Sequence, residues 1–482
     1  MSGEKFDMNK VLAVLAQPGK KVEPLQNTKQ ETELVKFIRK DNTVGVRKIR
    51  LYIPENASEP MPLIYVPHYE MQEDALELRD YLAQGWAVAS PTEMPADYNS
   101  ILTDDDLTFN NAALFQLRCR PDFDPERIMI IGGSAGGYTT LMLTGQNLGL
   151  CASIANSPVA NIYFNFYHYF QYVQALNLEK LKELQAKQQD KAVDADPGKT
   201  ETSGSGDRDP EAVRREKALE FLTRLKELPV PFAAALGPEF VANTANFPDL
   251  NDYARWEDHT GVGVAARFSS PLLVTHHTSD VLVPVDQITR RFTYPEPGAS
   301  LPADFNPRLP ENYPGVLGRS LEEVLPVEKT EVTCIHVPEK DKEQDLPFNP
   351  DKQFNLDIFD DGPVEGYGTH SSRMDMCRRF DVPYLKAMLE KGARVHTDLT
   401  PDMLSFLLDQ YNGRTQALPA HTGVDDTVYG SLRVYQRKVL MELSMWLSWH
   451  SEDELMEVFR KSPRRDEQLS VLQEVLVCVN SR

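Results

Sequence analysis

The sequence predicts an α/β protein built on a mostly parallel sheet. Its first third alternates short apolar segments with amphipathic ones, and strands that alternate with helices form parallel sheets covered on both faces. A half-buried strand is indicated by alternating apolar and polar residues over 44–53. The expected elements that follow are strands at 62–67, 86–90, 127–132 and 151–156 and helices at 72–84, 104–118 and 135–148.

The most informative motif lies where one of these strands meets a helix. The segment Arg127–Gly137 ends an apolar strand in Gly-Gly-Ser-Ala-Gly, which is the G-x-S-x-G pattern in its strand–turn–helix context. A serine at such a turn projects its hydroxyl from the sheet edge, and Gly132 and Gly136 leave room for it. The helix start places the Ala135 N–H beside Ser134, where it can stabilise an oxyanion.

An activated serine of this kind requires an acid and then a histidine later in the chain. In the segment Pro271–Pro284 an apolar strand ends in a polar turn, and Asp280 sits in that turn, whereas its rival Asp286 lies beyond Pro284. His370 lies in a glycine-rich loop after a strand-like run at 331–337. His421 is the alternative base and lies in the C-terminal extension.

These segments together resemble the α/β-hydrolases, and more narrowly the prolyl-oligopeptidase-type serine hydrolases and related esterases. The resemblance is carried by Asp124–Tyr138 and Ser270–Pro284 and covers roughly residues 44–160 and 265–392. It implies Ser134 as nucleophile, Asp280 as acid and His370 as base. It also implies an oxyanion hole from the amides of Ala135 and Tyr69. Contacts with substrate are expected from His68, Gly133 and Tyr138.

The sequence departs from the family pattern in two places. The family's His-Gly-Gly loop corresponds to His68-Tyr69-Glu70, in which the glycines are replaced. The stretch Lys340–Pro363, rich in Asp, Lys and Pro, is interpreted as an inserted loop that sets His370 further beyond the last strand than is usual.

We expect five parts along the chain. These are an N-terminal helical segment (1–43), a first core part (44–160), an inserted helical cap (161–265) with a disordered loop near 185–209, a second core part with insertions (266–392), and a helical C-terminal extension (393–482). Helical patterns are read at 11–15 and 32–38. The aromatic run 161–172 either lines a pocket or forms the core of the cap. The apolar stripe from Leu432 to Leu447 is typical of a core or of a homodimer face.

The composition of the chain argues against several classes of function. The chain has 482 residues with 72 acidic against 51 basic side chains, a net charge of -21, which argues against binding nucleic acid or anionic membranes. No signal core and no run of about 18 apolar residues appears, so a cytoplasmic protein is expected. Five dispersed cysteines do not form a disulfide framework. No dinucleotide, phosphate-loop or metal motif is found, so no cofactor or metal is expected.

The sequence therefore predicts a serine hydrolase that cleaves an ester or amide bond through an acyl-enzyme on Ser134. An esterase or small-amide hydrolase is favoured over a large-peptide protease, because no β-propeller repeat precedes the catalytic segments. Two alternatives stay open. One is a biosynthetic enzyme that uses the same fold for acyl transfer, cyclisation or elimination. The other is a catalytically silent binding module.

Overall fold

The structure is a computed structural model of the whole chain. It describes residues 24–39, 43–55, 60–92, 104–169, 171, 178, 182–183, 186, 251–280, 282–292, 308–336, 347–360, 370, 378–413 and 426–481. The predicted helix at 11–15, the loop near 185–209 apart from residue 186, and the alternative base His421 lie outside these residues.

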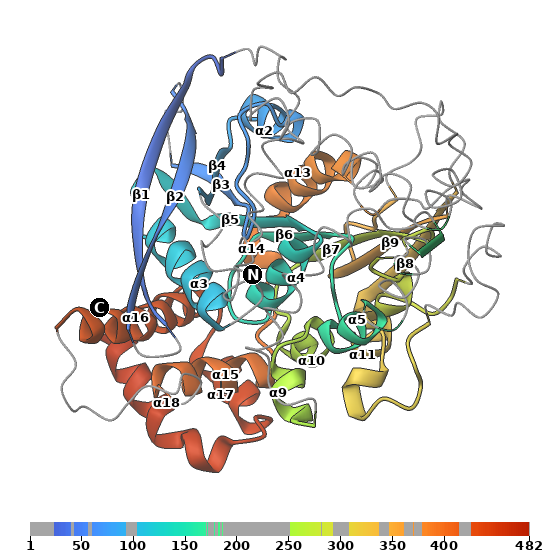
Figure 1. Cartoon of the computed structure of the whole chain (residues 1–482). Coiled ribbons are helices and arrows are strands. Elements are labelled where there is room, and N and C mark those ends of the chain that lie inside the picture. The colour runs from blue at the N-terminus through green and yellow to red at the C-terminus, as the bar shows by residue number, and fades with distance from the viewer. Residues whose placement is uncertain are drawn as a thin grey trace, which may run out of the picture.

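A nine-stranded sheet forms the centre of the molecule, in the order β1-β2-β4-β3-β5-β6-β7-β9-β8 (Figure 1). The β1–β2 and β2–β4 pairs are antiparallel, and every other neighbouring pair is parallel. The strands are β1 Thr28–Ile38, β2 Val44–Pro54, β3 Met61–Tyr65, β4 Ala87–Pro91, β5 Phe123–Gly133, β6 Ala152–Asn156, β7 Leu272–His277, β8 Thr330–His336 and β9 Phe354–Asp360.

Helices cover both faces of this sheet, as the alternation of strands and helices predicts. On one face, α2 (Leu76–Ala83) and α13 (Asp381–Lys391) pack on Ile64, Val88 and Met129. On the other face, α3 (Asp104–Arg118) and α4 (Ala135–Thr144) pack on the neighbouring residues of the same strands, such as Leu63 and Ile128. This period of two is what a strand buried on both faces requires.

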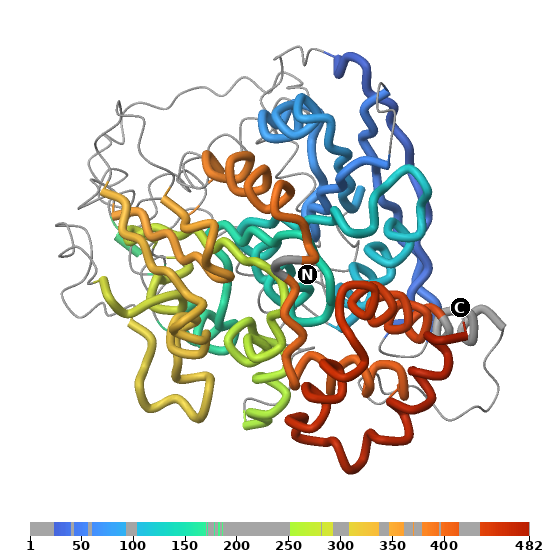
Figure 2. The backbone as a smooth tube through the Cα atoms, turned by 180° about the vertical axis from the view of Figure 1, so that it is seen from behind, coloured from blue at the N-terminus to red at the C-terminus, as the bar shows by residue number. Residues whose placement is uncertain are grey.

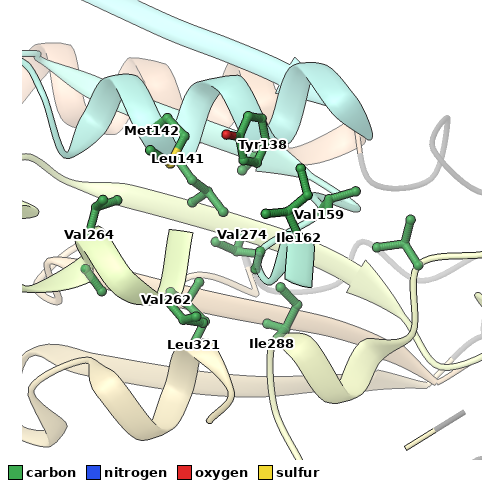
Figure 3. Packing of buried hydrophobic residues seen from close by; sticks show 14 of the residues in the cluster. Tyr138, Leu141, Met142, Val159, Ile162, Val262, Val264, Val274, Ile288 and Leu321 are labelled. Atoms are coloured by element: carbon green, nitrogen blue, oxygen red, sulfur yellow. The ribbon is translucent and has the colours of Figure 1, made fainter. Parts of the chain in front are cut away.

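The inserted region packs against α4 and the far half of the sheet. The helices α5 (Ile162–His168), α9 (Tyr253–Asp258), α10 (Gly261–Val264) and α11 (Leu321–Val324) share one apolar cluster with α4 and β7 (Figure 3). Tyr163 of the aromatic run is buried in it and makes edge contacts with Trp256 and Tyr313. This part of the aromatic run is therefore core.

Four helices at the C-terminus form a cluster of their own below the β1–β2 end of the sheet (Figures 1 and 2). They are α15 Pro401–Tyr411, α16 Asp426–Trp449, α17 Glu452–Arg460 and α18 Arg465–Asn480. The predicted apolar stripe packs inside this cluster through Val439, Leu443 and Trp446. The shorter elements of the chain are α14 Ala393–His396 and 3₁₀ helices at Ala265–Arg267, Val285–Gln287, Gly315–Gly318, Val327–Lys329 and Arg378–Phe380.

Two predicted elements were wrong. Residues 32–38 form the second half of β1, because Val35 and Phe37 point inward while Leu34 and Lys36 are exposed along an eleven-residue antiparallel pairing with β2. The stretch interpreted as an inserted loop contains β9, a fully paired strand between β7 and β8. Its apolar residues Phe354, Leu356 and Ile358 alternate with the polar Asn355 and Asp357, which is a strand pattern, although both polar side chains are buried.

None of the helices in the described part of the chain combines the length and apolar composition that a bilayer crossing requires.

A buried charge cluster attaches the C-terminal helices to the core. Glu442 of α16 lies 3.0 Å from the guanidinium of Arg118 and 3.1 Å from the ammonium of Lys438, and it accepts a hydrogen bond from the Leu148 amide. Burial lowers the pKa of Arg118 and of Lys438, and Glu442 opposes that shift. Removing the shared anion would leave two buried cations without a counter-charge.

We therefore expect Glu442→Gln to lower the free energy of unfolding by about 3–5 kcal/mol in urea denaturation. The matched control is Glu457→Gln, which removes an exposed pair with Lys461 and should cost at most about 1 kcal/mol. Equal effects of the two substitutions would mean that the cluster does not hold the helices to the core.

Candidate active site

Ser134 occupies a strained turn between β5 and α4. Its backbone has φ 55° and ψ -118°, outside the region that residues with a side chain ordinarily adopt. A Cβ added to Gly132 would lie 2.2 Å from the carbonyl oxygen of Gly136, so a glycine is required at position 132, as the sequence predicts. The Ser134 amide donates to the Asn156 carbonyl at 2.9 Å, which fixes the turn to β6.

Asp280 and His370 form a buried hydrogen-bonded pair. His370 Nδ1 lies 2.5 Å from Asp280 Oδ2, although ninety positions separate the two residues in the chain. The other oxygen of Asp280 accepts hydrogen bonds from the amides of Leu282 and Val283, at 3.1 and 2.9 Å. His370 Nε2 is buried and has no hydrogen-bond partner among the described residues.

The environment keeps Asp280 ionised. Burial alone would raise the pKa of this carboxyl, but the charge and hydrogen bond of His370, with smaller contributions from His277 and His276, outweigh burial and hold its pKa well below the usual range. An ionised carboxylate on Nδ1 orients an imidazole so that Nε2 can accept a proton.

The structure distinguishes Asp280 from the other candidates near it. Asp286 is buried, and its nearest cation is Arg308 at 3.8 Å; burial raises its pKa to about 6, against the opposing effect of Arg308. His277 Nε2 lies 3.7 Å from Asp280 Oδ2, beyond hydrogen-bond distance, while its Nδ1 lies 3.2 Å from the Ser279 hydroxyl. Burial lowers the pKa of His276 to about 4.

Parallel pairing brings the three predicted residues to one edge of the sheet. Ser134 follows β5, Asp280 follows β7, and His370 comes ten positions after the end of β9. These strands run parallel in the order β5-β6-β7-β9, so their carboxyl ends lie at the same edge. Ligands of open α/β sheets bind outside that edge. Because β9 precedes it, His370 is closer to a strand end than the sequence alone indicated.

The loop after β3 adopts a tight turn. His68 has φ 74°, and the Tyr69 amide donates to the Pro67 carbonyl at 2.9 Å, as in a γ-turn. The predicted oxyanion donor Tyr69 is thus engaged within its own turn. The turn lies beside the elbow, because a Cβ on Gly136 would meet the Pro67 carbonyl at 3.2 Å and the Tyr69 ring at 3.4 Å. Glu70 pairs with Arg50 at 3.0 Å.

Two predicted substrate contacts are buried side chains. His68 is 4% exposed, with Nδ1 3.7 Å from Asp106, which also pairs with Arg47. Tyr138 is fully buried in the apolar cluster of Figure 3, and burial raises its pKa strongly. Gly133 is the last residue of β5 and is half-buried, and Ala135 is the first residue of α4, where amides lack helical partners.

A buried polar network that the sequence did not reveal supports the turn. The backbone carbonyl of Asn156 accepts the hydrogen bond from the Ser134 amide. The side-chain oxygen of Asn156 accepts a hydrogen bond from the Thr275 hydroxyl at 2.6 Å, and its side-chain nitrogen lies 3.4 Å from Asp381. The Tyr81 hydroxyl donates to the same carboxyl at 3.0 Å. Burial raises the pKa of Asp381 to about 7, although the hydrogen bonds from Tyr81 and Asn156 lower it. No local motif connects these four positions, which come from different elements.

Comparisons with family models and with curated proteins found no match. Several solved structures are similar. Puromycin hydrolase is 12% identical, with a TM-score of 0.39, over 75% of this chain and 40% of that chain. The acylaminoacyl peptidase of Pyrococcus horikoshii is 14% identical, with a TM-score of 0.39, over 76% and 42%. An acetyl xylan esterase from Paenibacillus sp. R4 is 11% identical, with a TM-score of 0.36, over 78% and 92%.

This chain spans about two fifths of the length of the first two of these proteins.

The predicted fold class is confirmed by the chain's own topology. A mostly parallel sheet covered by helices on both faces carries a strained serine turn between a central strand and the following helix, which is the arrangement of an α/β-hydrolase.

The shifted Asp381 carboxyl predicts how stability depends on pH. Its folded pKa of about 7 lies above the unfolded value, so the folded state retains a proton that the unfolded state has already lost. The contribution to stability is complete below about pH 4 and is lost as the pH rises through about 7.

We expect Asp381→Asn to match the wild type in urea denaturation near pH 4 and to be more stable at pH 8, by up to a few kcal/mol, at about 1.4 kcal/mol per pKa unit. The exposed Asp453→Asn serves as control and should show no such dependence on pH. A variant less stable than the wild type at pH 8 would contradict this account of Asp381.

Proposed function

We propose that this chain is a serine hydrolase that cleaves an ester or amide bond through an acyl-enzyme on Ser134. The observation that carries the proposal is the buried Asp280–His370 pair at the sheet edge that also bears the Ser134 turn. An imidazole held on one side by a carboxylate can take a proton at its other nitrogen, and His370 Nε2 is buried without a hydrogen-bond partner, Ser134 Oγ included, among the described residues.

The proposed reaction uses these groups in two halves. His370 Nε2 takes the proton from the Ser134 hydroxyl as Oγ attacks the acyl carbonyl, and then gives it to the departing alkoxide or amine as the bond between the carbonyl carbon and that group breaks. Water enters next, gives a proton to His370 and attacks the acyl carbon. The carboxylic acid leaves as Ser134 regains its proton. Asp280 stabilises the charged imidazole in both halves.

The two amides proposed to donate to the oxyanion differ in position and in hydrogen bonding. The Ala135 amide stands at the helix start, whereas the Tyr69 amide is bonded to Pro67. A substrate oxygen has to replace the Pro67 carbonyl before Tyr69 contributes. Loss of one such donor costs about 10²–10³ in rate. An amide, whose amine is a poorer leaving group than an ester's alcohol, tolerates that loss less, so among the proposed substrates we favour an ester over an amide.

The engaged Tyr69 amide also favours a second candidate, a binding module in which the same site holds a ligand without turning it over. In that case the γ-turn is the permanent state of the loop. The two candidates differ in one respect that is simple to measure, namely whether Ser134 is activated.

We expect a fluorophosphonate probe to label the wild type and to leave Ser134→Ala unlabelled, because only an activated serine reacts. Ser157→Ala is the matched control, since Ser157 also has positive φ and follows the neighbouring strand β6. It should label like the wild type. Absence of labelling in folded wild-type protein would favour the binding module, and labelling of Ser134→Ala would exclude Ser134 as nucleophile.

Replacing the acid tests the role of the buried pair. Asp280→Asn should lower kcat for p-nitrophenyl esters by about 10⁴, because a neutral amide holds the wrong imidazole tautomer. Asp286→Asn removes the rival carboxyl six positions later and should keep most of the activity. The reverse order of the two effects would assign the acid to Asp286.

A further inference from the structure

Three side chains that could bind a metal ion lie at the β8 edge of the sheet. None of them is among the proposed catalytic residues. Cys334 and His336 are alternate residues of β8, so their side chains point to the same face. Asp360 ends β9 and is the register partner of His336. Among the described strands, β8 pairs only with β9 and forms that edge of the sheet, where Cys334 is exposed.

The three side chains already have the spacing of a metal site. One ligand atom from each lies within 4.8 Å of the others, and His336 Nδ1 is 3.3 Å from Asp360 Oδ2. In a tetrahedral zinc site with metal–nitrogen and metal–oxygen bonds of about 2.1 Å, the same two atoms are about 3.4 Å apart. That separation exceeds the 2.7–2.9 Å typical of a strong charged hydrogen bond between nitrogen and oxygen.

The donor set selects the kind of cation. A thiolate, an imidazole and a carboxylate suit zinc, whereas magnesium and calcium prefer oxygen ligands alone. When the thiol binds, the metal–sulfur bond replaces the sulfur–hydrogen bond, and the proton goes to solvent. Thiolate and carboxylate together balance the two positive charges of the ion. Three protein ligands leave the fourth tetrahedral position for water.

Neighbouring contacts connect this group to the rest of the sheet edge. The Thr278 hydroxyl donates to Asp360 Oδ1 at 3.4 Å, and the Thr278 amide donates to the Phe359 carbonyl at 2.9 Å. A hydrogen bond to the second oxygen of a ligating carboxylate orients it toward the metal. Thr278 belongs to the turn after β7 that also carries Asp280.

We propose that Cys334, His336 and Asp360 form a binding site for Zn²⁺, which joins the edge strand β8 to β9 and to the turn after β7. This site is independent of the proposed hydrolase activity. No motif in the sequence indicates it, because Asp360 is 24 positions from His336 and the Cys-x-His pair alone is not a metal signature.

Cobalt substitution tests the proposal directly, because Co²⁺ takes the same tetrahedral sites and gives a thiolate-to-metal charge-transfer band. The full chain, stripped with a chelator and kept reduced, should develop this band at one equivalent of Co²⁺, and one equivalent of Zn²⁺ should remove it. Cys334→Ser should lose the band, and His336→Ala should weaken cobalt binding at least tenfold.

Two matched variants control for other thiols and imidazoles. Cys119→Ser removes the other exposed cysteine in the described part of the chain, and His450→Ala removes a histidine that lies 3.6 Å from Glu454 and stacks on Trp446. Both should titrate like the wild type. Addition of Zn²⁺ should also raise the melting temperature of the wild type but not of Cys334→Ser. A wild type without the band, or a band that persists in Cys334→Ser, would overturn the site.

Discussion

The hydrogen bond between Asp280 and His370 is the contact on which the arrangement of the site depends. Burying an ionised carboxylate is costly unless it is paired and hydrogen-bonded. Asp280 meets this condition with two backbone amides on one oxygen and the His370 imidazole on the other. The histidine comes ninety positions later, so the chain has to return to the end of β7 before the carboxylate is satisfied. The strand β9 achieves this by inserting between β7 and β8, which leaves β8 at the edge with its cysteine and histidine exposed to solvent.

A second constraint acts at Ser134. Here the constraint is a strained backbone, whereas at Asp280 it is a buried charge. Such strain persists only where the surroundings over-determine it. Here the surroundings are the close approach of Gly132 to Gly136 and the hydrogen bond from the Ser134 amide to β6. Asn156 in turn is held by Thr275 from β7 and by Asp381 from α13. The turn, the strand β7 and a helix of the opposite face thus share one buried network.

The sequence predicted those features of the fold and the site that depend on residues close together in the chain. The Ser134 turn was predicted correctly because its glycines, strand and helix are contiguous. The helix α3 is also a contiguous segment, and it was predicted with its observed bounds. The strand β9 was missed because the Asp, Lys and Pro residues around it were interpreted as a loop, although apolar and polar residues alternate from Phe354 to Ile358. Its Asp357 is buried without a hydrogen-bond partner among the described residues, and burial raises its pKa to about 7. In β1, the residues Glu-Leu-Val-Lys-Phe-Ile fit a helix as well as a strand, and only the pairing with β2 decides between them. The network around Asp381 and the Cys334 group each join segments that are distant in sequence.

The central claim is that the Asp280–His370 pair acts on Ser134. The most direct test is a crystal structure of the protein after reaction with a small organophosphonate. We expect phosphorus bonded to Ser134 Oγ, His370 Nε2 within hydrogen-bond distance of the adduct, and the contact between Nδ1 and Asp280 retained. An adduct on another residue, or a His370 ring turned away from the phosphonyl group with Asp280 still bound, would contradict it.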